Sequence, residues 1–248
     1  MNEKALVILQ ARMSSKRFPG KVMKELNGAP MIMRQLDRIK RAQCVDKIVV
    51  ATTKDQSDDV LADFLLGENI EFHRGDMEDV ISRFAEIVSS NPLSTVVRLT
   101  ADCPLVMSEL LDEMINDFWS RNCEYLSNSI NPTYPDGLDV EVFSREALLK
   151  LNSMDLSKSE REHVTLGFMR SELKFNIYSY ESSVNNSNMR WTVDYPQDLE
   201  FIRNVYSHFQ GREDRFSFQE VLNLLIKDSS IVSSISGTRR NESLKDRE

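Results

Sequence analysis

The sequence has few cysteines and no long apolar run. Its three cysteines in 248 residues are odd in number and widely spaced, which fits neither a disulfide framework nor a zinc cluster. No stretch of eighteen apolar residues exists, so no membrane-spanning helix is expected. The first strand is expected after only four residues, without the charged, apolar and small-residue regions of a secretory signal. These absences predict a soluble, cytoplasmic protein with reduced thiols.

Three motifs of common enzyme classes are also missing. The apolar run at residues 5–9 is not followed by the Gly-x-Gly-x-x-Gly of a Rossmann dehydrogenase. Gly20 is the only glycine of the loop that follows, and Val22 stands where a Walker loop needs Ser or Thr. Glu162 and His163 do not extend to His-Glu-x-x-His. These gaps argue against a dinucleotide, P-loop or zinc-protease site.

A basic loop follows the first expected strand. Residues 10–21 hold four cations and two hydroxyl side chains but no acid, and residues 1–41 hold ten Lys or Arg against three acids, although the chain has a net charge of -8. Open α/β sheets bind ligands at the carboxyl ends of their strands, and cations and hydroxyls suit phosphate oxygens. We interpret the loop as a triphosphate site, with a solvated basic loop as the alternative. One basic segment does not predict a nucleic-acid partner, which would need a broad basic face.

Apolar patterning predicts alternating strands and helices. Strands are expected at 5–9, 47–52, 70–72 and 95–99, and helices from Pro30 to Ile39 and at 60–65, 80–88 and 110–118. Alternation of this kind predicts an α/β fold, with a doubly wound, mostly parallel sheet and helices on both faces.

We expect a single domain over residues 1–228. A turn-rich segment at about 124–180, with a strand at 138–143 and two short helices, is the candidate for a small insertion. A short apolar strand at 190–194 and helices after Pro196 and at 218–226 follow. Residues 229–248 lack aromatic residues and helical periodicity, so we expect a mobile tail.

Two carboxylates are candidates for a metal site. Asp102 follows the strand at 95–99, and Asp194 ends the apolar run at 190–194. Each has a simpler explanation, because Asp102 can cap the turn before Pro104 and Asp194 can cap the helix at Pro196. Two carboxylates at one sheet edge, opposite a phosphate loop, are better explained together as ligands of Mg²⁺.

Two further residues have weaker chemical signals. A lone histidine such as His163 is more often packed or on the surface than an acid or base. Cys103 lies beside Asp102, but no activating partner can be assigned to it.

An ordered series of motifs resembles one family. The chain closely resembles the cytidylyltransferases of the spore-coat polysaccharide biosynthesis type, which are similar to the CMP-sugar synthetases for sialic acid and 3-deoxy-manno-octulosonate. The match runs in order over about residues 5–206, and its motifs lie at 10–31, 50–52, 72–75, 79–80, 98–105, 134–141, 162–165, 190–194 and 198–199. The fold implied is nucleotide-diphospho-sugar transferase-like and Rossmann-like.

The resemblance implies a reaction in which CTP and an acidic sugar of the nonulosonic or octulosonic acid type give a CMP-sugar and pyrophosphate, for surface polysaccharide or glycan biosynthesis. The implied nucleotide-binding residues are Arg12, Ser15, Arg17, Lys21, Ala51, Thr52, Arg74 and Thr100. Among them Arg12 and Lys21, with Asp102, are implied to act in catalysis by stabilising charge on the phosphates. Asp102 and Asp194 are implied to hold Mg²⁺.

The segment at 124–180 is implied to contribute to the acceptor pocket and to a homodimer, with Asp136, Glu141 and His163 on the acceptor side. The resemblance does not identify the acceptor. Sialic acid enzymes usually carry Asn where this chain has Val22, and octulosonate enzymes usually carry Gln where it has Thr100. Two rival functions are a glycosyltransferase that consumes a nucleotide-sugar and a silent module that binds CTP or a sugar nucleotide. The single Asp of Thr-Ala-Asp-Cys disfavours the first, because such enzymes commonly have Asp-x-Asp.

Overall fold

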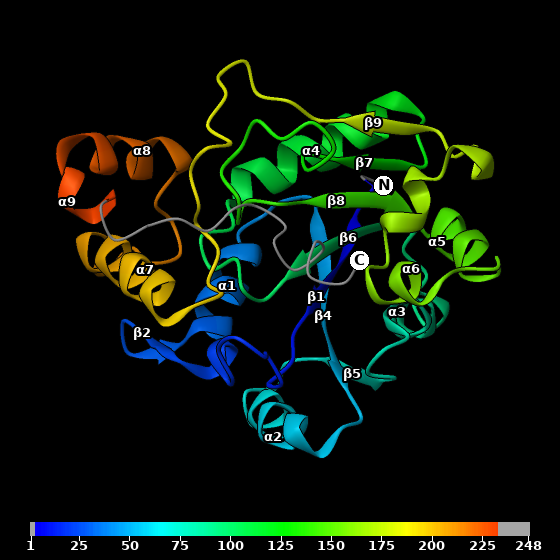
Figure 1. Ribbon diagram of the computed structural model, residues 1–248, viewed down its shortest axis with the longest axis horizontal. Helices are drawn as coiled ribbons and strands as arrows, with labels where there is room; N and C mark the ends of the chain where they lie inside the picture. The colour runs from blue at the N-terminus through cyan, green and yellow to red at the C-terminus, as the bar shows by residue number, and fades with distance from the viewer. Residues whose placement is uncertain (1–2, 233–248) are drawn as a thin grey trace.

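The computed structural model describes residues 3–232, and its central strand is buried on both sides (Figure 1). In β1 (Ala5–Gln10), Ala5, Val7 and Leu9 pack into one apolar core, whereas Leu6 and Ile8 pack into another. Successive side chains of a strand point to opposite faces, so this apolar run places a strand in the middle of three layers.

Seven strands form the main sheet. Their order is β5 (Phe72–Gly75), β4 (Val45–Thr53), β1, β6 (Thr95–Thr100), β8 (Glu141–Ser144), β7 (Tyr125–Ser127) and β9 (Ile177–Ser179). β5, β4, β1 and β6 are parallel, β8 is antiparallel to both of its neighbours, and β9 is parallel to β7. The sheet is therefore mixed but mostly parallel, which confirms the predicted fold class.

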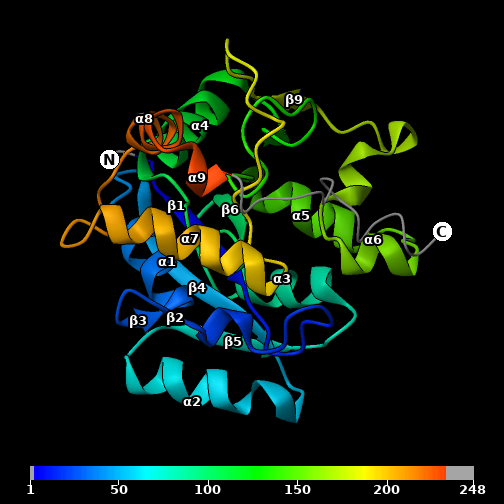
Figure 2. The ribbon, with the colours of Figure 1, turned by 60° about the vertical axis from the view of Figure 1, so that its left-hand side comes forward.

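Helices cover both faces of this sheet. The first core includes side chains of α1 (Met31–Ile39), α2 (Asp59–Gly67), α4 (Ser108–Arg121), α7 (Pro196–His208) and α8 (Phe218–Lys227). The second includes those of α3 (Val80–Ser89) and α5 (Arg145–Asn152), and α6 (Lys158–Glu162) lies beside α3. Figure 2 shows α1 and α7 on one side of the sheet and α3, α5 and α6 on the other.

Short elements complete the fold. The hairpin of β2 (Glu25–Leu26) and β3 (Ala29–Pro30) precedes α1. Within residues 3–232, four 3-10 helices lie in the loops. These are η1 (Lys21–Met23), η2 (Gln56–Asp58), η3 (Leu166–Met169) and η4 (Ser171–Leu173).

Most expected elements are present, but the expected strand at 190–194 is not. Its backbone bonds go to two different loops, because Trp191 N donates to Asp136 O at 2.6 Å and Val193 N to Asp102 O at 2.8 Å. Only an isolated bridge between Asp136 and Arg190 has strand-like pairing. Asp194 therefore does not end a strand, although these bonds still bring it close to Asp102.

The later part of the chain differs in two further ways. The segment at 124–180 adds β7, β8 and β9 to the main sheet, and its expected strand at 138–143 begins only at Glu141. Residues 229–232 form α9 (Ser229–Val232), with Ile231 buried in the first core, where a mobile tail was expected. The remainder of that expected tail, 233–248, lies outside the described residues.

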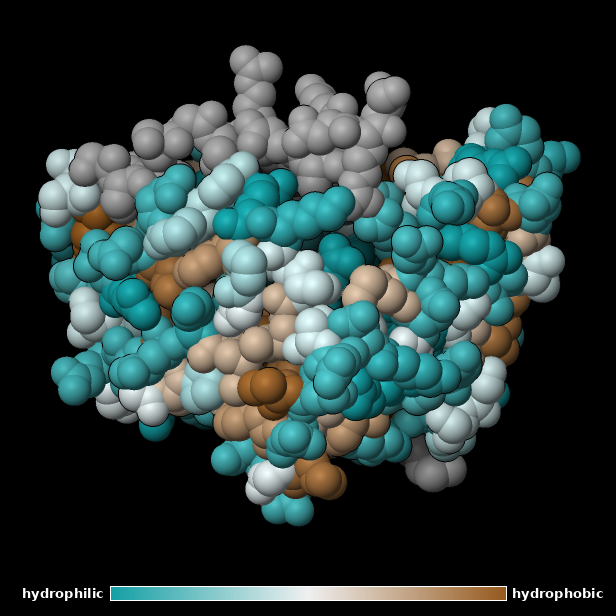
Figure 3. All heavy atoms as spheres, turned by 60° about the horizontal axis from the view of Figure 1, so that its bottom comes forward, coloured by the Kyte–Doolittle hydropathy of each residue, from teal (hydrophilic) through white to brown (hydrophobic). Residues whose placement is uncertain are grey.

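The surface shown in Figure 3 is largely hydrophilic, with apolar residues in small groups. Among residues 3–232, no helix combines the length and the apolar character that crossing a bilayer requires.

Candidate active site

The basic loop after β1 is anchored by a buried carboxylate. Met13 N donates to Asp58 Oδ1 at 2.6 Å, and Thr53 N at the end of β4 donates to Asp58 Oδ2 at 3.1 Å. Gly20, with φ of 70°, donates its N–H to Met13 O at 2.9 Å and closes the loop. The chain then enters η1 with the Lys21 side chain directed into the protein.

Lys21 lies between the two carboxylates predicted from the sequence. Its Nζ donates to Asp102 Oδ2 at 2.8 Å, to Asp194 Oδ1 at 3.1 Å and to Val193 O at 2.7 Å. Burial alone would lower the pKa of Lys21, but the two carboxylates outweigh it and leave that pKa raised. The side chain is therefore a fixed ammonium at the edge of the sheet.

Asp194 is held by further cations. Arg17 Nη2 lies 2.7 Å from Asp194 Oδ1, and Arg190 Nη2 lies 2.7 Å from Asp194 Oδ2. Burial would raise the pKa of Asp194, but Lys21, Arg17 and Arg190 together hold it well below its usual range. The N–H groups of Asp194 and Tyr195 each donate to Asp198 Oδ2 at 2.8 Å, which fixes the turn into α7.

Two cavities meet at this cluster. One, of about 390 Å³, lies against the basic loop, and we call it the loop cavity. The other, of about 400 Å³, lies against the segment at 124–180, and we call it the insertion cavity. Both are lined by Arg17, Thr100, Asp102 and Asp194, so these four residues form a shared wall.

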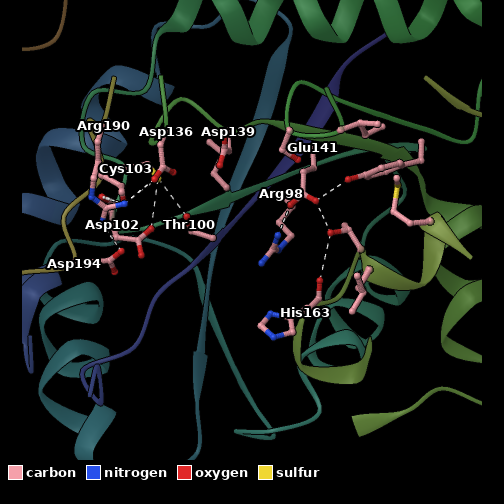
Figure 4. Close-up of a pocket in the computed structure, with 18 of the residues that line it drawn as sticks. Arg98, Thr100, Asp102, Cys103, Asp136, Asp139, Glu141, His163, Arg190 and Asp194 are labelled. Carbon is pink, nitrogen blue, oxygen red and sulfur yellow. Dashed lines mark hydrogen bonds and ion pairs between the residues drawn. The ribbon is translucent and has the colours of Figure 1, made fainter. Parts of the chain in front are cut away.

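The insertion cavity contains a buried ion pair between neighbouring strands. Arg98 Nη1 on β6 pairs with Glu141 Oε2 on β8, while Arg98 Nη2 donates to Gln10 Oε1 at 3.1 Å. The other oxygen of Glu141 accepts from Tyr125 Oη at 2.8 Å and from the Thr165 hydroxyl. Figure 4 shows Arg98, Glu141 and His163 in one part of this cavity, with Asp102, Asp136, Arg190 and Asp194 in another.

The structure brings most predicted site residues together. Arg12, Ser15, Arg17, Lys21, Thr100, Asp102 and Asp194 line the loop cavity, and Asp136, Glu141 and His163 line the insertion cavity. The remaining three lie outside both. The side chains of Ala51 and Thr52 are fully buried, and Arg74 donates to Thr53 O at 2.7 Å and pairs with Asp59 at 2.6 Å. Their predicted roles toward the nucleotide gain no support from these two cavities.

Three site residues were missed in the sequence. A charged residue inside the apolar strand at 95–99 was the available signal for Arg98. Arg190, which joins Asp136 at 2.7 Å to Asp194, and Asp58 had no comparable signal, because their partners are brought to them only by folding.

The thiol of Cys103 is expected to be unreactive. Burial and the adjacent Asp102 raise the pKa of its thiol well above the usual range. The thiol is therefore protonated at neutral pH, and a protonated thiol is a poor nucleophile.

The two carboxylates suit a divalent cation. Both contact the same atom, Lys21 Nζ, so their oxygens converge on one cationic position, and carboxylate oxygens are the ligands that Mg²⁺ prefers. Within residues 3–232 no group of three or more His, Cys, Asp or Glu could hold a metal. Mg²⁺ often needs only one or two carboxylates, because phosphates and water complete its shell.

Comparison with known proteins identifies the family. A family model described as Cytidylyltransferase matches residues 6–228. The chain is 30% identical over 227 residues to the spore coat polysaccharide biosynthesis protein SpsF of Bacillus subtilis, covering 89% of this chain and 93% of that one. The structure of a cytidylyltransferase from Leptospira borgpetersenii is similar, with a TM-score of 0.88 and 29% identity over 96% of this chain and all of that one.

A more distant structure shares the fold. The CMP-2-keto-3-deoxy-manno-octonic acid synthetase complexed with CTP has a TM-score of 0.62 at 18% identity, over 84% of this chain and all of that one. Because the family model spans most of the sequence, the chain belongs to the cytidylyltransferase family and is a nucleotidyltransferase.

Proposed function

We propose that the protein transfers CMP from CTP to an acidic sugar. An acceptor hydroxyl gives up its proton to solvent and its oxygen forms a bond to the α-phosphorus, while the bond from that phosphorus to the bridging oxygen breaks and pyrophosphate leaves. The observation that carries this proposal is the shared wall, because two cavities that meet at Asp102 and Asp194 allow two substrates to meet there.

The loop cavity is the proposed site of the triphosphate. Arg12, Ser15, Arg17 and Lys21 line it and supply cations and a hydroxyl for phosphate oxygens. Negative charge builds up on these oxygens as pyrophosphate departs, so fixed cations lower the barrier. Loss of one such contact typically costs about a hundredfold or more in rate.

Asp102 and Asp194 are the proposed ligands of Mg²⁺. The ion would neutralise phosphate charge and make the α-phosphorus easier to attack. Asp102 is suited to this role because Lys21 keeps its pKa lowered against the effect of burial, so the carboxylate is ionised at neutral pH.

The insertion cavity is the proposed acceptor site. Asp136, Glu141 and His163 line it, with Arg98 and Arg190 as nearby cations. A nonulosonic or octulosonic acid presents hydroxyls for the acids and a carboxylate for the cations. The SpsF relative is named a spore coat polysaccharide biosynthesis protein, and we propose that the product of this chain also serves surface polysaccharide biosynthesis. We propose a cytoplasmic location for the enzyme. We also propose a homodimer, which light scattering would test.

Pyrophosphate release tests the reaction. Wild-type protein with Mg²⁺ is given each of the four nucleoside triphosphates, together with sialic, legionaminic, pseudaminic or octulosonic acids or simple phosphonates. Release is expected with CTP and one acidic sugar. A silent binding module would bind CTP without release, and a glycosyltransferase would release nothing from CTP but would consume a nucleotide-sugar.

The substitution Asp102→Asn tests the metal assignment. It keeps the size of the side chain but removes a carboxylate, so turnover is expected to fall at least about a hundredfold. Circular dichroism checks that the variant is folded. Asp63→Asn on the exposed surface of α2 is the matched control, and a folded Asp102→Asn variant with normal turnover would refute the assignment.

A further inference from the structure

The ammonium of Lys21 occupies a position that a metal ion would also favour. It lies 2.8 Å from Asp102 Oδ2 and 3.1 Å from Asp194 Oδ1, and a third bond of 2.7 Å to Val193 O fixes it there. The residue is only 7% exposed. A buried cation therefore already contacts both carboxylates that are proposed to bind Mg²⁺.

A divalent cation cannot join this arrangement without strong repulsion. It would lie within a few ångströms of the Lys21 ammonium, and Arg17 and Arg190 already pair with Asp194 at 2.7 Å each. Charges at such distances repel strongly in a partly buried site. The metal and the ammonium are thus alternative partners of the same carboxylates.

The nucleotide offers Lys21 another partner. Lys21, Asp102 and Asp194 all line the loop cavity, so a triphosphate bound there would lie next to the ammonium. A long, flexible lysine side chain can turn from carboxylate to phosphate without movement of the backbone. Each phosphate contact made by Lys21 then frees carboxylate oxygens for the metal.

We propose that Lys21 is a built-in competitor for the divalent cation, so that the site takes up the metal–triphosphate complex and resists the bare metal. This inference rests on the proposed metal site. It assigns to Lys21 a second task beside phosphate binding, namely the control of when Asp102 and Asp194 are available.

Direct metal titration without nucleotide tests this proposal. Mn²⁺ is the probe, and its free concentration is followed by electron paramagnetic resonance; CTP is left out because it binds the metal itself. Lys21→Met removes the charge with little change in volume, and its Mn²⁺ affinity is expected to rise by about tenfold or more over wild type. Lys21→Gln is the second variant, because it is uncharged but keeps a donor for Val193 O.

Three controls make the result specific. Lys24→Met removes the same charge from a nearby exposed residue that lines neither cavity, and it should change the affinity by less than about twofold because solvent screens it. Lys21→Arg keeps the charge and should bind Mn²⁺ as weakly as wild type. Adding Asp102→Asn to Lys21→Met should abolish the gain.

The outcomes separate this inference from the proposed function. Folded Lys21→Met and Lys21→Gln variants that bind Mn²⁺ no more tightly than wild type overturn the proposal, whatever the protein catalyses. A clear gain in a protein that releases no pyrophosphate from CTP overturns only the reaction. A gain that survives loss of the Asp102 carboxylate places the metal elsewhere and also overturns the proposal.

Discussion

At the scale of single residues, the carboxylate of Asp194 joins cations from two distant parts of the chain. Arg17 and Lys21 come from the loop after β1, and Arg190 lies four residues before Asp194. These contacts connect the first and last thirds of the protein. Breaking a buried pair by removing one partner typically costs about 3–5 kcal/mol.

The stability contributed by Asp194 depends on pH. The pKa of Asp194 in the folded protein lies below the value of about 3.9 that it has in the unfolded chain. Its ionised form therefore stabilises the fold fully above the unfolded pKa, and this contribution is lost as the pH falls through the folded pKa. Asp194→Asn is expected to lower the free energy of unfolding by about 3 kcal/mol at pH 7 and by less at pH 3. Urea unfolding at both pH values measures this.

Exposed Asp63→Asn again serves as the control, with little effect at either pH. An Asp194→Asn deficit of equal size at pH 7 and pH 3 would contradict this origin of the stability.

The sequence could predict where a residue lies when its position depends on the neighbouring chain alone. The basic loop and Asp102 were expected at the same sheet edge because each follows the carboxyl end of a strand, and both line the loop cavity. Arg98 and Glu141 are 43 positions apart, and their pairing depends on the antiparallel register of β6 and β8. Arg74 was assigned to the nucleotide, but its partners, Thr53 O and Asp59, follow from the packing of β5 beside β4.

At the scale of elements, Gly137 controls how closely two loops approach. Its φ is +105°, and a Cβ there would lie 2.5 Å from both Thr192 N and Trp191 C. The approach places Asp136 beside Arg190, which in turn reaches Asp194. Only glycine combines this backbone conformation with this contact.

Gly137→Ala is therefore expected to destabilise the protein and disturb the acceptor side. Gly211→Ala is a matched control, since its φ is +81° but nothing lies within 4 Å of an added Cβ. The Gly137 variant should lose at least about 2 kcal/mol more than the control, because it adds a backbone clash to the conformational strain. Thermal unfolding of both variants measures the difference, and equal losses would show that strain alone matters.

Among elements, the helices and central strands were predictable because their apolar periodicity is long and regular. The prediction of a strand at 190–194 was wrong, and the reason lies in its backbone hydrogen bonds. Its side chains alternate like those of a strand, but its backbone partners are Asp136 and Asp102, which lie in separate loops. β7 and β9 have three residues each, too few for a pattern.

At the scale of the whole molecule, two different parts of the chain form the loop cavity and the insertion cavity, and the sheet brings these two cavities together. The loop after β1 contributes Arg17 to the shared wall, and the segment at 124–180 supplies half of the residues that line the insertion cavity. The charges follow the same division, because the N-terminal region is basic within an acidic chain. Composition predicted the basic N-terminal segment, whereas the meeting of the two cavities follows only from the folded sheet.

The shared wall also has a consequence for the partial reactions of the proposed transfer. The wall consists of Arg17, Thr100, Asp102 and Asp194, and the neighbouring thiol of Cys103 is protonated because its pKa is raised. These groups therefore include no strong nucleophile that could form a covalent bond to the nucleotidyl group. Labelled pyrophosphate should therefore not exchange into CTP until the acceptor is present. Exchange in its absence, measured by radiolabel incorporation, would reveal a covalent nucleotidyl-enzyme. No exchange is the result expected of a single, direct transfer between the two substrates, which inverts the configuration at phosphorus.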